Sequence, residues 1–279
     1  GSPTQKVGYE VLSELPKEHH DRPMLSLNKT KSVDELREWL GNQKGLLSWK
    51  MDGLTVVLTY EDGKLAKAVT RGNGEVGEVI TNNAKTFVNL PMTIPYKGHL
   101  VLRGEAVITY GDFEKLNASI ADEAAKYKNP RNLCSGSVRQ LNSEITASRN
   151  VRFMGFALVQ AEDVDFKNSK KKQAEWLAGL GFEMVESVEV TAETIADAIA
   201  EFAKKVEDYN IPSDGLVLLY DDIAYGASLG RTAKFPRDSI AFKWADELQE
   251  TKLSYIEWSA SRTGLINPVA VFEPVELEG

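Results

Sequence analysis

One segment constrains the fold more than any other: SWKMDGLTVVLTYEDGKLAKAVTRGN, from Ser48 to Asn73. It contains two β-like runs, Leu54 to Tyr60 and Lys64 to Thr70, joined by Asp62-Gly63, a dipeptide that favours tight hairpin turns. A third β-like run, Gly45 to Lys50, directly precedes them and ends on a lysine. The segment therefore predicts antiparallel strands with a lysine at the end of the first one.

Lys50 is the first candidate for chemistry. A lysine flanked by apolar residues at a strand end is costly unless it is paired or used, because its ammonium loses water. Asp52 follows two residues later, so its side chain shares the face of Lys50 if the segment stays extended. Gly53 then allows a backbone or a ligand to approach closely.

Two later β-like runs also contain charged residues among apolar ones. HLVLRGEAVITY carries Arg103 and Glu105 at i and i+2, and SIAFKW carries Lys243. Charged residues on several apolar strands favour one site that the strands line together. Salt bridges on solvated sheet faces are the alternative for each residue taken alone.

The order of expected elements favours an α+β fold of antiparallel sheets with flanking helices, because hairpins alternate with helices without a regular βαβ period. Further strands are expected at Leu100–Ile108, Val151–Val159, Glu183–Val190, Leu216–Tyr220 and Ile240–Trp244. Helices are expected at Ser32–Leu40, Glu78–Leu90, Asp112–Ala125, Asn132–Leu141, Asn168–Leu180 and Thr191–Tyr209.

The composition is that of a globular protein, with 42% hydrophobic and 27% charged residues among 279. No run approaches the ~20 apolar residues that span a bilayer, and no basic-then-apolar leader opens the chain, so we expect a cytoplasmic protein. The single cysteine, Cys134, excludes an internal disulfide and a four-cysteine zinc site, and three scattered histidines give no metal site.

The net charge of −8 argues against a general nucleic-acid-binding surface. Charge is uneven, however: residues 126–152 contain six basic residues and one acid, Glu144. A local basic patch of this kind can contact one face of a duplex.

Taken together, the segments resemble the adenylation domain of the bacterial NAD-dependent DNA ligases, within the wider group of lysyl nucleotidyltransferases. KMDG at Lys50–Gly53 is similar to the nucleophile motif K-x-D-G of that family. Other similar segments follow in the family's order: TRGNG at 70–74, RGEAV at 103–107, NPRNLCSGSVRQL at 129–141, SDGLVLL at 213–219 and AFKW at 241–244.

The resemblance implies the lysyl nucleotidyltransferase fold of DNA ligases and mRNA capping enzymes, with antiparallel sheets and flanking helices around a nucleotide cleft. It further implies that Lys50 attacks the adenylyl phosphate of NAD, forms lysyl-AMP and releases nicotinamide mononucleotide. AMP would then pass to the 5′-phosphate of nicked double-stranded DNA, which the 3′-hydroxyl seals. Mg²⁺ is expected to assist, and the protein is expected to act as a monomer. Because a free lysine is almost wholly protonated at neutral pH, neighbouring cations must help it to lose its proton.

The resemblance also implies a role for each matching residue. The catalytic set is Lys50, Asp52 and Lys243. The nucleotide-binding set is Ser26, Leu27, Ser48, Lys50, Arg71, Glu105 (at the ribose), Arg131 and Lys243. Arg139 matches a residue of the DNA-facing surface.

Two positions depart from the family pattern. Ser48 stands where the ligases have an acid that accepts from the adenine amino group, and Leu219 stands where they have a phosphate-facing lysine. Lys234, on the loop before the last strand, is a candidate replacement for that cation. The departures keep two alternatives open: an ATP-dependent lysyl nucleotidyltransferase, and a non-catalytic nucleotide- or DNA-binding paralogue.

The resemblance divides the chain into two parts. Residues 1–247 correspond to the adenylation domain, with a lead-in at Ser2–Gly8 and Pro23–Ser32. Residues 248–279 correspond to the first strands of an OB-fold domain that is truncated here.

Overall fold

The computed structural model describes residues 14–244. The helices are α2 (Val33–Leu40), α3 (Thr81–Ala84), α4 (Tyr110–Ser119), the 3₁₀ helix η1 (Glu123–Ala125), α5 (Pro130–Val138), α6 (Ser143–Ala147), α7 (Lys170–Gly179), α8 (Ile195–Lys205) and α9 (Ile223–Ser228). The strands are β1 (Lys17–His19), β2 (Lys29–Thr30), β3 (Gly45–Met51), β4 (Leu54–Glu61), β5 (Lys64–Thr70), β6 (Val76–Glu78), β7 (Leu100–Val107), β8 (Arg152–Gln160), β9 (Ser187–Val190), β10 (Ser213–Tyr220) and β11 (Ser239–Phe242).

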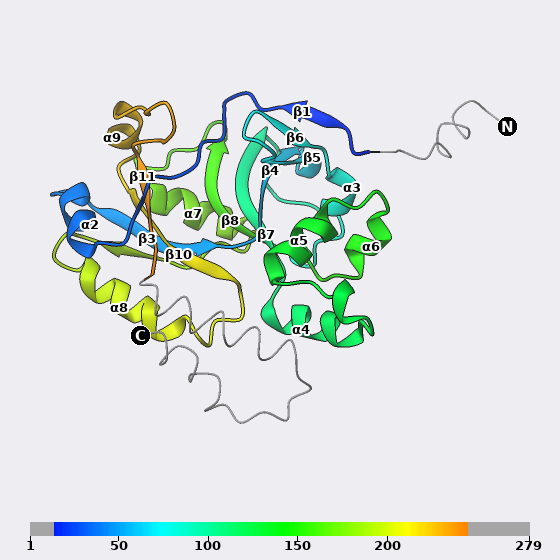
Figure 1. Cartoon of the computed structure of the whole chain (residues 1–279). Helices are drawn as coiled ribbons and strands as arrows, with labels where there is room; N and C mark the ends of the chain where they lie inside the picture. The colour runs from blue at the N-terminus through cyan, green and yellow to red at the C-terminus, as the bar shows by residue number, and fades with distance from the viewer. Residues whose placement is uncertain (1–13, 245–279) are drawn as a thin grey trace, which may run out of the picture.

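The strands form three sheets, and the fold is α+β as the sequence predicts. A five-stranded sheet has the order β2-β11-β10-β3-β9, a four-stranded sheet has the order β5-β4-β7-β8, and β1 pairs with β6. Every pair is antiparallel except β2 with β11. Helices lie outside the two larger sheets (Figure 1).

The two larger sheets are joined directly by the turn between β3 and β4. β3 is a central strand of the five-stranded sheet, and β4 is a central strand of the four-stranded sheet. At the turn, a Cβ on Gly53 would lie 2.0 Å from the carbonyl oxygen of Ala106, so only glycine fits there. Asp52 and Gly53 thus form a corner from which both sheets extend.

One core lies between the five-stranded sheet and helices α2 and α8. Trp49 of β3 is 2% exposed and stacks on Tyr209, with ring centroids 4.5 Å apart. Phe202 of α8 meets the same indole edge-on. Because side chains alternate along a strand, burying Trp49 directs its neighbours Ser48 and Lys50 to the other face, where both stay partly exposed.

A second core lies under the four-stranded sheet. Tyr60, Leu102 and Phe153 from its strands pack with Phe113 of α4 and Leu133 of α5. This core fixes α5 beside the Asp52-Gly53 corner, where Arg131 of α5 pairs with Asp52.

The hairpin prediction is confirmed, since Asp62 and Gly63 have φ of 49° and 79°, as a type I′ turn requires.

The helix predicted at Glu78–Leu90 is wrong, because only Thr81–Ala84 is helical. The buried amide of Asn83 donates to the carbonyls of Val138 and Gln140, and these tertiary contacts hold the segment in a different path.

The helix predicted at Asp112–Ala125 is also shorter than expected. It begins after Thr109, whose hydroxyl accepts from the amide of Asp112, and it ends at Ser119. A short 3₁₀ turn follows at Glu123–Ala125.

The predicted OB-fold strands in 248–279 and the lead-in at Ser2–Gly8 lie outside the described residues. Within residues 14–244, no helix is both long enough and apolar enough to cross a membrane.

Candidate active site

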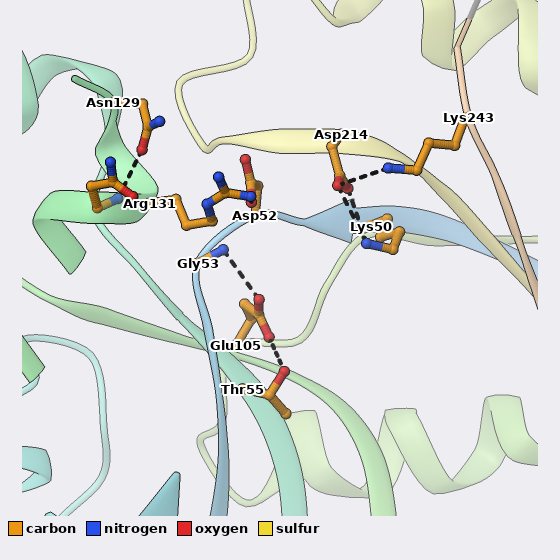
Figure 2. Close-up of polar contacts among 10 residues, drawn as sticks. Lys50, Asp52, Gly53, Thr55, Glu105, Asn129, Arg131, Asp214 and Lys243 are labelled. Atoms are coloured by element: carbon orange, nitrogen blue, oxygen red, sulfur yellow. Dashed lines mark hydrogen bonds and ion pairs between the residues drawn. The ribbon is translucent and has the colours of Figure 1, made fainter. Parts of the chain in front are cut away.

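Lys50 and Lys243 meet at one carboxylate, that of Asp214 (Figure 2). Lys50 Nζ lies 3.2 Å from Asp214 Oδ1, and Lys243 Nζ lies 3.5 Å from Oδ2. The three side chains are each about a quarter exposed. The structure thus brings together two of the three residues predicted to be catalytic.

Local backbone geometry places Asp214 at that point. The register between β10 and β3 shifts between Ser213 and Leu216, so Asp214 sits in an irregular part of the ladder. Gly215 follows with φ of 152°, and a Cβ there would lie 2.2 Å from the carbonyl oxygen of Phe242. The glycine therefore allows β11, which leads to Lys243, to pack closely beside β10.

Asp214 is a functional candidate that the sequence reasoning missed. The signal was present, because an acid followed by glycine opens an apolar strand at SDGLVLL. The same pattern, an acid and a glycine beside an apolar run, led to Asp52.

Glu105 lies on the other sheet, near the corner. Its Oε2 accepts from the amide of Gly53 at 3.1 Å, and its Oε1 accepts from the hydroxyl of Thr55 at 2.7 Å (Figure 2). Burial raises the pKa of Glu105 to about 7, although these two hydrogen bonds and the charge of Lys50 act in the opposite direction. Glu105 is therefore an acceptor that the fold holds in one orientation.

Asp52 pairs with Arg131, not with the neighbouring Lys50. It lies beyond the end of β3, and its Oδ1 is 3.7 Å from Arg131 Nη1, whereas Lys50 pairs with Asp214. Burial raises the pKa of Asp52, and the nearby Asp214 adds to the rise, while Arg131, Lys50 and Lys243 oppose it. Asp52 thus connects the corner to α5.

Arg131 is positioned by the start of α5. The side chain of Asn129 accepts from the amide of Asn132 at 2.8 Å and caps the helix, and Pro130 occupies its first position. Arg131 follows at once, so a well-defined cap holds it beside Asp52 (Figure 2).

Arg71 connects the segment before β2 to the end of β5. Its guanidinium donates to the carbonyl of Met24 at 3.3 Å and to the hydroxyl of Ser26 at 3.2 Å. The neighbouring Leu27 is half-buried, and Asn28 accepts from the amide of Ala241 on β11 at 2.8 Å. Ser26 and Leu27 therefore lie between the two larger sheets.

Arg139 caps the C-terminal end of α5 and lies away from the Lys50 cluster. Its Nε is 2.6 Å from Glu78 Oε1, and half of its side chain is exposed. It lines a pocket of about 410 Å³ together with Gly53, Thr55 and Arg71, among others. A second pocket, of about 500 Å³, shares Gly72, Glu78 and Arg139 with the first. Arg139 thus stands on a continuous hollow that begins at the corner.

Much of the basic segment at 126–152 is neutralised within the fold. Four of its basic residues have acidic partners, in the pairs Lys126–Glu123, Arg131–Asp52, Arg139–Glu78 and Arg152–Glu183. The free positive charge on this face is therefore smaller than the sequence count indicates.

Ser48 and Leu219 are near neighbours on the face that carries Lys50. Ser48 is paired in register with Val217, and Leu219 with Leu46. Lys234, the candidate replacement cation, stays exposed in a turn closed by Thr232 and Phe235.

No group of three or more His, Cys, Asp or Glu side chains that could hold a metal ion occurs within residues 14–244. Asp52 and Asp214 are close enough for the charge of Asp214 to raise the pKa of Asp52. Mg²⁺ is commonly held by one or two carboxylates together with phosphate oxygens of the substrate. Asp52 and Asp214 fit a site of that kind better than a site built from protein ligands alone.

The comparisons with known proteins are consistent with this geometry. A family model described as NAD-dependent DNA ligase adenylation domain matches residues 12–247. A DNA ligase of Lachnoclostridium phytofermentans is 66% identical over 279 residues, which is 100% of this chain and 43% of that protein. A DNA ligase of Ruminiclostridium cellulolyticum is 65% identical over 278 residues, which is 100% of this chain and 42% of that protein. The chain therefore spans less than half the length of these relatives.

Solved structures show more distant likenesses. An archaeal ATP-dependent RNA ligase aligns with a TM-score of 0.48 and 14% identity over 84% of this chain and 51% of its own. A mycobacterial DNA ligase D complexed with ATP and MES aligns with a TM-score of 0.44 and 14% identity, over 80% and 60% of the two chains.

Proposed function

Because the chain belongs to the family of NAD-dependent DNA ligase adenylation domains, we propose that it transfers AMP from NAD to Lys50. The observation that carries the proposal is the pairing of Lys50 and Lys243 with one carboxylate, Asp214. A nucleophilic lysine at a strand end and a second cation are then both within hydrogen-bond range of one proton acceptor, Asp214.

The reaction begins when the Lys50 ammonium gives up a proton. Asp214 is the acceptor within reach, at 3.2 Å from Nζ. The free Nζ lone pair attacks the α-phosphorus of NAD, forming a P–N bond. The P–O bond to the nicotinamide mononucleotide breaks, and that product leaves with the bonding electron pair. The attacking nitrogen loses its second proton to the departing phosphate group, and Lys50 then carries AMP as a phosphoramidate.

Lys243 and Arg71 stabilise the negative charge that develops on the phosphate oxygens, which is the main catalytic lever in transfers of this kind. Lys243 is held near the Lys50 amine because both lysines pair with Asp214. Arg71 is held by Met24 and Ser26 on the other side of the corner.

Glu105 accepts hydrogen bonds from the ribose hydroxyls of the nucleotide. Ser26 and Leu27 border the nucleoside from the N-terminal segment. Phe156, which exposes 42% of its surface at a bulge of β8 and packs against neither core, offers a ring on which the base can stack.

Mg²⁺ supplies additional positive charge to the phosphates when it is bound. Asp52 and Asp214 are the described carboxylates placed to share it with phosphate oxygens. The deprotonation and the attack are assigned to residues of the chain itself.

We extend the proposal to the complete protein, of which this chain is similar to less than half. AMP passes from Lys50 to the 5′-phosphate of a nick in double-stranded DNA, and the 3′-hydroxyl then seals the nick. Arg139 contacts DNA phosphate, whereas Asp52 and Arg131 act at the corner, near the opposite end of α5. Residues 1–247 form the adenylation domain, 248–279 begin an OB-fold, and the protein acts as a cytoplasmic monomer in DNA replication and repair.

The test is the intact mass of the full-length protein after incubation with NAD and Mg²⁺. The protein gains one AMP, and Lys50→Ala abolishes the gain. Lys44→Ala is the matched control, because Lys44 begins the same strand region but pairs with Glu189 on the surface, and it keeps the label. Label on Lys50→Ala rules out this nucleophile, and labelling by ATP with no response to NAD establishes the ATP-dependent alternative.

A second candidate function is non-catalytic binding of nucleotide or DNA. The neutral residues Ser48 and Leu219, on the same sheet face as Lys50, favour it, because a phosphate-facing cation is missing from that surface. Two measurements distinguish this candidate from the enzyme. Calorimetry would show that adenosine nucleotides bind, and the intact mass of the full-length protein would stay unchanged after incubation with NAD.

A further inference from the structure

Arg71 stands at the start of an exposed turn. It follows β5, where its amide donates to the carbonyl of Thr55 at 2.9 Å. The turn itself, residues 71–76, contains two glycines with positive φ, Gly72 at 58° and Gly74 at 96°. Because glycine leaves the backbone free to adopt many conformations, contacts with other parts of the chain must hold this turn in one of them.

Those contacts come from residues 17–26, which we call the clasp. β1, the first part of the clasp, pairs antiparallel with β6. Directly after β1, the amide of His20 donates to the carbonyl of Glu75 at 2.8 Å, and farther along the amide of Met24 donates to the carbonyl of Gly74 at 2.8 Å. A Cβ on Gly74 would lie 2.8 Å from the carbonyl oxygen of Met24, so the clasp and the turn are in direct contact.

The imidazole of His20 reaches the backbone of Arg71. Its Nε2 lies 3.0 Å from the carbonyl oxygen of Arg71. A carbonyl oxygen only accepts hydrogen bonds, so Nε2 carries the proton. The same oxygen accepts from the amide of Gly74 at 3.0 Å, so both of its lone pairs have donors. His20 therefore fixes the backbone of Arg71 where the turn begins.

The clasp also orients the guanidinium of Arg71. Its Nε donates to the carbonyl of Met24, and its Nη2 donates to the hydroxyl of Ser26. These bonds use two of the five N–H donors of a guanidinium. The other donors have no carboxylate partner within residues 14–244, and Arg71 lines the pocket that also contains Gly53. A guanidinium that is held in one orientation with donors to spare suits a phosphate group.

We propose that His20 is a positioning residue for AMP transfer. This role rests on the proposed function, in which Arg71 stabilises the charge that develops on the phosphate oxygens of NAD. A displacement of ~1 Å can remove much of the effect of such a group, because its interaction depends on distance and orientation. His20 itself does not contact the nucleotide, so its effect on the rate disappears when the side chain of Arg71 is absent.

The test measures single-turnover labelling of Lys50 in the full-length protein over a range of NAD concentrations. His20→Ala lowers the maximal rate roughly tenfold, because the lost stabilisation belongs mainly to the transition state. For the same reason, the NAD concentration that gives half of the maximal rate changes by less than about threefold.

Conservative variants show whether the hydrogen bond matters. His20→Gln restores the maximal rate to within about threefold of the wild type, because its amide nitrogen takes the place of Nε2. The shorter amide of His20→Asn matches Nδ1 instead and cannot reach the carbonyl of Arg71, so this variant stays slow. His19→Ala is the matched control, since it removes the adjacent exposed histidine, and it keeps the wild-type rate.

A double-mutant cycle separates positioning from general destabilisation. Arg71→Ala is slow, and adding His20→Ala slows it by no more than about twofold further, because both changes remove the same contribution. Equal slowing of the wild type and of Arg71→Ala by the His20→Ala change overturns the positioning role, and so does a wild-type rate for His20→Asn. Thermal unfolding establishes that each variant is folded. If His20→Ala does not fold, the rates of His20→Gln and His20→Asn decide.

The positioning role and the proposed function fail in different ways. A wild type that never gains AMP refutes the transfer and the positioning role together. A wild type that gains AMP, and that is slowed by Arg71→Ala but by no His20 variant, refutes the positioning role alone. A wild-type rate for Arg71→Ala also refutes it and leaves the transfer to Lys50 intact.

Discussion

Lys50 Nζ lies 3.2 Å from Asp214 Oδ1, although 164 positions separate the two residues in the chain. The contact exists because β3 and β10 are neighbouring antiparallel strands whose register shifts at Asp214. A charged amine next to a strand end is thereby paired, which offsets the cost of removing it from water. The same contact places a proton acceptor at the proposed nucleophile.

Replacing Asp214 should therefore impair the chemistry more than the fold. We expect Asp214→Ala to slow AMP transfer to Lys50 in the full-length protein by roughly 100-fold, equivalent to about 3 kcal/mol of the barrier. Single-turnover labelling with NAD measures the rate. Asp34→Ala removes an exposed acid that pairs with Arg37 on α2, and it should leave the rate unchanged. Unchanged labelling of Asp214→Ala would show that Asp214 has only a structural role.

The sequence predicted those parts of the site in which a charge interrupts an apolar strand. Lys50, Glu105 and Lys243 were each visible in this way, and the resemblance added Arg71 and Arg131. The local signal for Asp214 was present, but it does not show that an irregular register between β10 and β3 brings this carboxylate to Lys50. Likewise, the helix expected from Glu78 failed because Asn83 makes tertiary hydrogen bonds, which override local propensity.

Glu105 should give the protein a measurable pH dependence. Because burial raises its pKa to about 7 from 4.5, the folded state holds this proton more tightly than the unfolded state. The resulting stabilisation is fully present below about pH 4.5 and is lost as the pH rises through about 7. We expect the free energy of unfolding, relative to Glu105→Gln, to fall by up to about 3 kcal/mol across that interval. Urea unfolding at several pH values provides the measurement.

The control for that experiment is Glu193→Gln, which changes an exposed carboxyl group before α8. This variant should keep the pH profile of the wild type. A constant difference between the wild type and Glu105→Gln from acid to neutral pH would contradict the assignment of the proton to Glu105.

Gly215 should be sensitive to even a single methyl group. Gly215→Ala places a Cβ 2.2 Å from the carbonyl oxygen of Phe242 at a φ of 152°, so β11 must shift and Lys243 with it. We expect a loss of about 2 kcal/mol or more in the free energy of unfolding. Gly179→Ala is the matched control, since its Cβ meets nothing within 4 Å at the end of α7, and it should be neutral or stabilising. Equal stability of the two variants in thermal unfolding would exclude close packing at Gly215.

Arg139 should separate the nucleotide reaction from the DNA reaction. Its guanidinium lies in the hollow beside the corner, where Glu78 holds it at 2.6 Å, and it has no contact with the Lys50 cluster. In the full-length protein, Arg139→Ala should therefore gain AMP from NAD at the wild-type rate but seal nicked DNA at least about tenfold more slowly, because one phosphate contact is lost. Labelling and sealing are measured on the same preparation. Lys204→Ala, on the distant surface of α8, should change neither rate. If Arg139→Ala loses labelling and sealing in equal proportion, Arg139 serves the nucleotide site and the proposed DNA-facing surface is wrong.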